Sequence, residues 1–297
     1  MTQYFANLVG SAVEPVAWAR RREAEGWDGV GVADHLWAGT TTFPHWAVTL
    51  GQIAAVTERV TLLSCFANNL LRSPVEFAQA ALTLQRASNG RFEAGLGAGW
   101  VREEAEGSGL RFPGAGERVE RFAEAVRIVR DLFAHGQCTH SGSHYNVNVA
   151  CLGPEVGTPP PIVVAVGGPR TIRDVAPLAD RVELTYNAAV TRGGEHRRHE
   201  MTKLGRDHLD ELIALAAAAA PSVPRGIFLS VACGQTEMIE RMRDANALGI
   251  PGLAGAPEEV ASTIASLIDA RVDRVQLTPV TPETLDLLAP HLPLGVE

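Results

Sequence analysis

Residues 91–107 read RFEAGLGAGWVREEAEG, a strand-like segment that runs into three glycines at alternate positions. Glycines after a strand let the backbone approach a ligand or a neighbouring helix closely, because they carry no Cβ atom. The spacing here is GxGxG, whereas a dinucleotide-binding turn has GxGxxG and follows the first strand of its half. This stretch follows the fourth strand-like segment, which disfavours a Rossmann fold. A flavin-like ring, or plain packing of a strand against a helix, both stay open.

Strand-like and helix-like segments alternate on both sides of this stretch. The expected strands are 3–9, 28–33, 60–66, 92–97, 162–166, 181–186, 226–232 and 272–277. The expected helices are 13–25, 45–57, 74–88, 117–134, 170–178, 195–219, 236–248 and 257–270. Short strands that are apolar on both faces are typical of a parallel sheet covered by helices. The pattern predicts an α/β fold with residues 1–297 in one domain, a (β/α)₈ TIM barrel with insertions after strand four and before strand five.

Capping signals support these boundaries. Ser73-Pro74 and Ala256-Pro257 are typical of helix starts, and Asn89-Gly90 is typical of a helix end. The segment 135–161 interrupts the alternation and is longer than ordinary connections. We expect it to be a functional loop or to contain a small hairpin.

The composition narrows the class of protein. Hydrophobic residues make up 46% of the chain and charged residues 20%, and the net charge is -8 without a basic stripe. These values favour an ordinary globular core and argue against a nucleic-acid partner. No apolar run approaches the ~20 residues of a membrane span, and residues 1–10 lack signal-peptide features, so we expect a cytoplasmic protein. The four scattered cysteines and the histidines show no metal-ligand spacing, so we expect structural thiols and no metal site.

Asp34 and His35 end the second expected strand. In a TIM barrel, chemistry takes place at the carboxyl ends of the strands. Histidine is well suited to move protons near neutral pH, and an aspartate can orient a neighbour or a ligand. The pair is a candidate catalytic dyad, although a capping aspartate beside an incidental histidine fits the spacing as well.

Five segments together resemble the luciferase-like superfamily of flavin-type oxidoreductases, and within it the branch that uses the deazaflavin coenzyme F420. They are residues 23–37 with DH, 58–112 with RSP, SNGR and GLGAGW, 118–133, 159–170 with VGG, and 255–277. The order of the segments matches the family over most of the chain.

The resemblance implies a set of coenzyme contacts. Asp34 and His35 would lie near the reactive ring, with His35 as the residue that handles the proton. Cys65 and Phe66 would be joined by a non-proline cis peptide against the back face of the ring. The glycines of strand four would make room for the ring and its ribityl chain, and the backbone of Gly167-Gly168 would face the phosphate. The other implied coenzyme contacts are Asn68, Ala98, Gly99 and Glu103.

One position departs from the family. The F420-dependent sugar-phosphate dehydrogenases carry a glutamate directly after the glycines of strand four, and this chain has Trp100 there. An indole cannot transfer a proton, so a sugar-phosphate substrate is disfavoured; Glu103 or Glu104 could substitute for the missing acid. Trp37, Trp46 and Trp100 suggest an apolar or aromatic substrate pocket.

The resemblance implies an F420-dependent oxidoreductase that passes a hydride between C5 of the deazaflavin and a small organic substrate. Arg72 and Arg170 are candidates for the phosphate side. The runner-up is an FMN-dependent two-component monooxygenase of the same fold, which would need a reductase. A non-catalytic coenzyme-binding protein is a third interpretation. The family also implies a homodimer.

Overall fold

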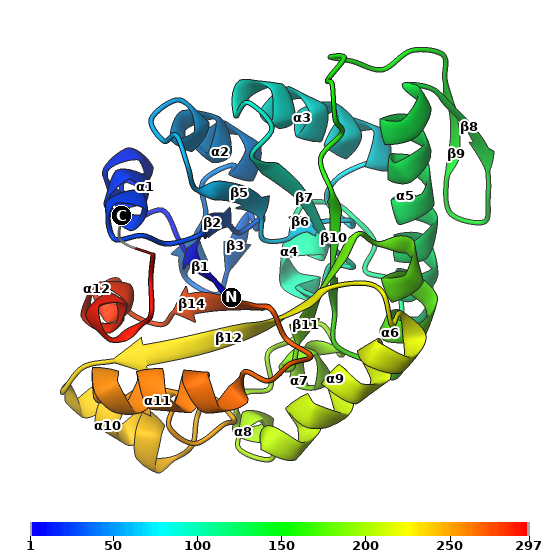
Figure 1. Cartoon of the computed structure of the whole chain (residues 1–297). Coiled ribbons are helices and arrows are strands. Elements are labelled where there is room, and N and C mark those ends of the chain that lie inside the picture. The colour runs from blue at the N-terminus through cyan, green and yellow to red at the C-terminus, as the bar shows by residue number, and fades with distance from the viewer. Residues whose placement is uncertain (1, 296–297) are drawn as a thin grey trace.

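The computed structural model describes residues 2–295 and shows eight parallel strands closed into a barrel (Figure 1). The barrel strands are β1 (Gln3–Leu8), β2 (Gly29–Val32), β5 (Thr61–Ser64), β7 (Phe92–Gly97), β10 (Ile162–Val166), β11 (Arg181–Thr185), β12 (Arg225–Cys233) and β14 (Arg274–Pro279). Each strand pairs with its neighbour in chain order, and β14 pairs with both β12 and β1, which closes the ring. The eight predicted strands and the TIM-barrel fold are confirmed.

Helices cover the outside of the barrel (Figure 1). Those that were predicted are α1 (Pro15–Ala24), α2 (Trp46–Ala54), α3 (Pro74–Ala87), α5 (Ala115–His135), α6 (Pro169–Val175), α9 (Arg206–Ala219), α10 (Glu237–Asp244) and α11 (Pro257–Leu267). The single helix predicted over 195–219 is wrong, because α8 (Arg198–Met201) ends before an extended residue, Gly205, and α9 begins after it. The short helices α4 (Arg102–Gly107), α7 (Ala188–Thr191) and α12 (Thr284–Leu288) were not predicted, since four to six residues carry little periodicity.

Short strands decorate the carboxyl end of the barrel and the insertions. They are the hairpin β3 (Trp37–Ala38) and β4 (Thr41–Thr42), β6 (Ala67–Asn68) beside β7, and β13 (Ala254–Gly255) beside β12. The segment 135–161 contains a second hairpin, β8 (Cys138–Ser141) and β9 (Asn146–Val149), which packs outside α5 (Figure 1). The Glu124 carboxylate on α5 holds this hairpin, because it accepts hydrogen bonds from the Tyr145 N–H (2.8 Å) and faces His140 Nε2 (2.9 Å).

A buried ion-pair network fills the amino-terminal half of the barrel. Arg274 at the start of β14 is 1% exposed, and its guanidinium donates to Glu93 of β7 (2.5 and 2.8 Å). The same group approaches Glu183 of β11 at 3.4 Å, and burial raises the pKa of Glu183 to about 7. These side chains cross the barrel interior, so open space for a ligand lies at the carboxyl ends of the strands.

No helix within residues 2–295 is long and apolar enough to cross a membrane.

Candidate active site

The loops after β2, β5 and β7 meet at the carboxyl end of the barrel. The loop after β2 carries Asp34, which is 2% exposed. Its carboxylate accepts a hydrogen bond from the backbone N–H of Asn68 (2.9 Å), which lies after β5. It also accepts two from the Arg72 guanidinium, at 2.9 and 3.3 Å. Asp34 therefore ties two loops together, and its lone pairs face protein groups.

His35 is paired with a carboxylate. Its Nδ1 lies 3.1 Å from Glu104 Oε2, although the two residues are far apart in the sequence. Glu104 is 0% exposed and also accepts hydrogen bonds from the Leu36 N–H and from Asn68 Nδ2 (3.3 Å). Because a carboxylate accepts at Nδ1, the neutral imidazole carries its proton on Nδ1, and Nε2 keeps a lone pair. The His35 side chain is 19% exposed, so the ring remains reachable from outside.

Of the two glutamates that begin α4, Glu104 contacts His35, and Glu103 is exposed. Both lie in the first turn of α4, but consecutive helical residues point in different directions. The Glu103 side chain is exposed, whereas Glu104 faces the barrel end. Sequence reasoning assigned the coenzyme contact to Glu103 and gave Glu104 only as a substitute acid.

The predicted non-proline cis peptide between Cys65 and Phe66 is present. The Cys65 thiol is buried and donates to Gln276 Oε1 at 3.2 Å inside the barrel; burial raises the pKa of this thiol. Phe66 is partly exposed at the barrel end, and its ring lies 6.0 Å from that of Phe228.

The three glycines of strand four differ in whether contacts within the protein require a glycine at that position. A side chain at Gly95 would clash with the Ser64 carbonyl oxygen. Gly99 has a positive φ of 77°, and a side chain there would clash with Asn68. At Gly97, by contrast, a Cβ would make only ordinary contacts, 3.4 Å from Phe66 Cβ and 3.9 Å from Ala165 Cβ. Of the three, only Gly97 has no contact within the protein that requires glycine.

A similar contrast separates Gly167 from Gly168, which follow β10. A Cβ at Gly167 would clash with the Thr185 carbonyl oxygen, whereas one at Gly168 would only meet the end of Arg192, 3.4 Å away. Within residues 2–295, the Arg192 guanidinium has no hydrogen-bond or ion-pair partner among the described side chains. Neither of the two arginines suggested for the phosphate side is free in this way. Arg72 binds Asp34, and Arg170 donates to Glu120 at 2.6 Å.

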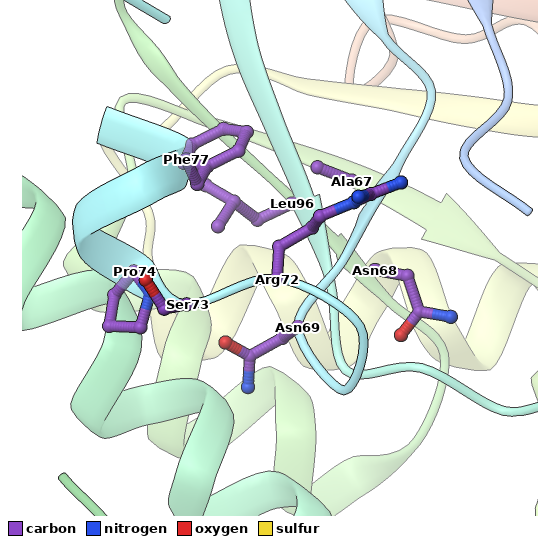
Figure 2. A pocket seen from close by; sticks show the side chains of 8 residues that line it. All are labelled: Ala67, Asn68, Asn69, Arg72, Ser73, Pro74, Phe77 and Leu96. Atoms are coloured by element: carbon purple, nitrogen blue, oxygen red, sulfur yellow. The ribbon is translucent and has the colours of Figure 1, made fainter. Parts of the chain in front are cut away.

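A small pocket lies beneath the loop after β5, next to the first turn of α3 (Figure 2). Its lining comprises Ala67, Asn68, Asn69, Arg72, Ser73, Pro74, Phe77 and Leu96. The backbone N–H of Asn69 donates to the Gly97 carbonyl (3.0 Å), and its side-chain oxygen accepts from the Tyr145 hydroxyl (3.1 Å). Its buried Nδ2 has no hydrogen-bond partner among the described residues. A buried amide donor without a partner costs about 1–3 kcal/mol, so this group is an unsatisfied donor at the edge of the pocket.

Aromatic rings surround His35. The Phe43 ring centroid lies 5.2 Å from that of His35, and the Trp100 ring lies edge-on at 5.9 Å. The Trp100 ring centroid also lies 6.1 Å from that of His196. Trp37 packs on α4, where a Cβ at Gly107 would lie 2.8 Å from its indole. Trp46, which the sequence suggested for the pocket, is instead fully buried in the core between Phe77 and Phe92.

Residues 9–246 match the family model of the luciferase-like monooxygenases. The chain belongs to this family.

Several named relatives of this luciferase-like protein are coenzyme enzymes. An F420-dependent glucose-6-phosphate dehydrogenase of Kineococcus radiotolerans is 35% identical over 156 residues, which are 51% of this chain and 46% of that protein. The dehydrogenase of the same description from Beutenbergia cavernae is 36% identical over 171 residues, 56% of this chain and 49% of that protein. The luciferase-like chain thus spans about half the length of these curated relatives.

Solved structures share the luciferase-like barrel over nearly the whole chain. An F420-dependent secondary alcohol dehydrogenase in complex with an F420-acetone adduct superposes with a TM-score of 0.77 at 19% identity, covering 100% of this chain and 99% of that one. A monooxygenase from Streptomyces bottropensis gives a TM-score of 0.75 at 21% identity, with 98% of each chain covered. Likeness at this identity shows the fold.

Three features of the luciferase-like site were missed from the sequence. Phe43 and Arg192 lie in loops whose course no local pattern predicts. Asn69 directly follows Asn68, which the sequence indicated as a coenzyme contact. The Asn69 side chain is held by the Tyr145 hydroxyl of the distant hairpin. Among the described residues, no group of three or more His, Cys, Asp or Glu side chains could hold a metal ion.

Proposed function

We propose that this protein is an F420-dependent oxidoreductase in which His35, held by Glu104, moves a proton at the substrate. The observation that carries the proposal is the His35–Glu104 pair, with Nδ1 and Oε2 3.1 Å apart, at the open end of a luciferase-like barrel. The relatives named F420-dependent support the choice of coenzyme.

The residues present fit a long, planar, anionic coenzyme. Gly97 leaves space above Phe66 and Ala165, where a side chain would otherwise project. Next to it, the unpartnered Nδ2 of Asn69 offers a buried donor. Further along, Gly168 and the Arg192 guanidinium lie side by side at the end of the neighbouring strand β10. These groups lie at the ends of β7 and β10. We assign the space at Gly97 to the coenzyme ring, the Asn69 donor to the ribityl chain, and Gly168 with Arg192 to the phosphate.

F420, when bound, supplies C5 as a donor or acceptor of hydride. The protein's own part is to handle the accompanying proton. Because Glu104 accepts the Nδ1–H of His35, the lone pair of Nε2 can take a proton from a substrate hydroxyl, and the protonated ring can return one to a carbonyl oxygen. Asp34 and Asn68 act as positioning residues, since they fix the loops that carry His35 and the coenzyme contacts. Trp100 and Phe43 line the space beside this ring.

The FMN-dependent monooxygenase of the same fold is the second candidate, favoured by the description of the matching family. It needs the same space above Phe66. The two differ at the far end of the coenzyme, where F420 carries an acidic tail beyond its phosphate. The free Arg192 guanidinium beside Gly168 fits the phosphate that both coenzymes carry, so the choice of F420 rests on the relatives named F420-dependent.

Fluorescence titration of the purified protein with F420 and, separately, with FMN tests the proposal. We expect saturable binding of F420 that is at least tenfold tighter than that of FMN. A preference for FMN would move the protein to the monooxygenases, and a test for O₂ uptake with reduced FMN would follow. Binding of neither coenzyme would contradict both candidates. His35→Asn separates an enzyme from a non-catalytic binding protein, because only an enzyme loses turnover while it keeps coenzyme binding.

A further inference from the structure

We infer that the substrate of this site is an uncharged, flat molecule, of the class of aromatic or conjugated ketones and their alcohols, and that Trp100 selects it. The inference rests on the proposed function and goes beyond it, because it names a substrate class that differs from the sugar phosphate of the named relatives.

The walls around His35 are aromatic. The Phe43 and Trp100 rings lie 5.2 and 5.9 Å from the His35 ring, and both side chains are partly exposed. Large aromatic side chains usually bury most of their surface, so partly exposed ones at the end of a barrel are suited to cover an apolar ligand. The Trp100 ring lies nearly perpendicular to the His35 ring, at 79°. A flat molecule whose oxygen reaches His35 would therefore also pack against the Trp100 indole.

The loop that follows α7 packs against α4 and contacts Trp100. Gly194, with φ of 96°, packs so tightly on α4 that a Cβ there would lie 2.8 Å from Arg102 Cβ and 2.9 Å from the Phe112 ring. The Arg102 N–H also donates to the Gly194 carbonyl (2.9 Å). The same loop brings His196 to Trp100, with the ring centroids 6.1 Å apart and an interplanar angle of 68°. The indole therefore contacts two imidazole rings.

Arg72, Arg102 and Arg118 are already engaged, and the free Arg192 is assigned to the coenzyme phosphate, which disfavours a phosphorylated substrate. The guanidinium groups of Arg102 and Arg118 lie over the two sides of one ring system, 4.5 and 4.4 Å from the Phe112 centroid. Arg118 also donates to two backbone carbonyls, at 2.7 and 2.8 Å, and Arg102 pairs with Glu106. Arg72 is held by Asp34. A phosphate dianion needs charge-assisted partners, and these arginines would have to give up existing ones.

The reaction balances with the proposed coenzyme as the second reactant. In the reductive direction, the carbonyl carbon of a ketone gains a hydride and its oxygen gains a proton from His35. The two electrons come from reduced F420. In the oxidative direction, the alcohol loses the same hydride and proton, and oxidised F420 is the acceptor.

Three probes test the substrate class by binding alone. They are acetophenone, cyclohexyl methyl ketone, which has a saturated ring of the same size, and glucose 6-phosphate. Protein saturated with oxidised F420 is titrated with each by calorimetry, and saturation-transfer NMR reports contact. The F420 titration is carried out first, so that failure of the proposed function appears there and failure of the substrate inference appears here.

We expect acetophenone to bind about three- to tenfold more tightly than the saturated ketone, and glucose 6-phosphate to show no saturable binding. Trp100→Ala should weaken acetophenone about tenfold and remove its advantage over the saturated ketone, while Trp100→Phe should stay within about threefold. Trp18→Ala, on α1 and under the Arg22 guanidinium, is the matched control. Thermal melting verifies that each variant is folded. Saturable binding of glucose 6-phosphate, no binding of acetophenone, or an unchanged ketone preference in Trp100→Ala would overturn the inference.

Discussion

Glu104→Gln is the sharpest test of the proposed proton-handling pair. The substitution keeps the size of the side chain and removes its charge. Glu104 accepts from three donors, namely the Leu36 N–H, His35 Nδ1 and Asn68 Nδ2. A glutamine has one acceptor oxygen and one NH₂ group. If the oxygen keeps the Leu36 N–H, the NH₂ group faces His35 and can only donate to Nδ1. The imidazole then carries its proton on Nε2, which is the wrong tautomer for a base.

The size of the effect follows from the lost hydrogen bond. A hydrogen bond to a charged group contributes about 1.5–3 kcal/mol. At 1.4 kcal/mol for each factor of ten, the loss corresponds to a decrease in kcat/KM of roughly ten- to 150-fold. F420 affinity should change less than threefold, because the substitution leaves Gly97, Asn69 and Arg192 in place.

The assay reads the tautomer directly and requires no known substrate. Long-range ¹H–¹⁵N correlation at alkaline pH distinguishes a protonated from an unprotonated ring nitrogen. In the natural protein, we expect the His35 proton on Nδ1, and in Glu104→Gln on Nε2. Glu103→Gln is the matched control, because this neighbour is exposed on α4 and should change nothing. An unchanged His35 tautomer in Glu104→Gln, or an equal effect of Glu103→Gln, would refute the reasoning.

Four further predictions concern other groups. His35→Asn should keep F420 binding within about threefold and lower kcat about 10²–10⁴-fold, measured by the absorbance of the coenzyme. Gly97→Ala should weaken F420 binding at unchanged melting temperature, whereas Gly95→Ala should lower the melting temperature, because only the second Cβ would clash with the protein. Arg192→Ala should weaken F420 binding and reduce its salt dependence, seen in titrations at two ionic strengths, without destabilising the fold. Burial raises the pKa of Glu183 from 4.5 to about 7, so its contribution to stability is present below pH 4.5 and is lost as the pH rises through 7. Glu183→Gln should remove that part of the pH dependence in urea unfolding, and an unchanged slope would contradict the assignment.

The sequence was sufficient for the barrel because its signals are local. Each strand is a short apolar segment, and helix starts such as Ser73-Pro74 are chemical features of two neighbouring residues; the Ser73 side chain caps α3 by accepting the Glu76 N–H. Asp34 and His35 were found for the same reason, since a strand end defines their place. The failure over 195–219 is also local in origin. Apolar spacing resumes on both sides of Gly205, and the extended residue that separates α8 from α9 leaves little trace in that spacing.

The partners within the site could not be predicted, because they depend on how distant loops meet. His35 and Glu104 approach only once β2 and α4 are placed around the same barrel end. The difference between Glu103 and Glu104 is a rotation of about 100° around a helix of six residues, too short to show a periodic pattern. Trp46 was grouped with other tryptophans as a sign of an apolar or aromatic pocket, but it begins α2 and packs against Phe77 and Phe92. Phe43, in the loop just before it, occupies the place beside His35 instead.

The glycine stretch itself shows why spacing could not decide between packing and a coenzyme. Gly95 is required by the Ser64 carbonyl, and Gly99 by its positive φ and by Asn68, so two of the three positions are explained by the protein alone. Gly97 lies between them, and in the GxGxG pattern it looks the same. Only the position of a hypothetical Cβ, in ordinary contact with Phe66 and Ala165, distinguishes it. No internal contact demands glycine there, and the proposed coenzyme is the group that we expect to need the space. Strand packing therefore explains two of these glycines, and under the proposed function the coenzyme explains the third.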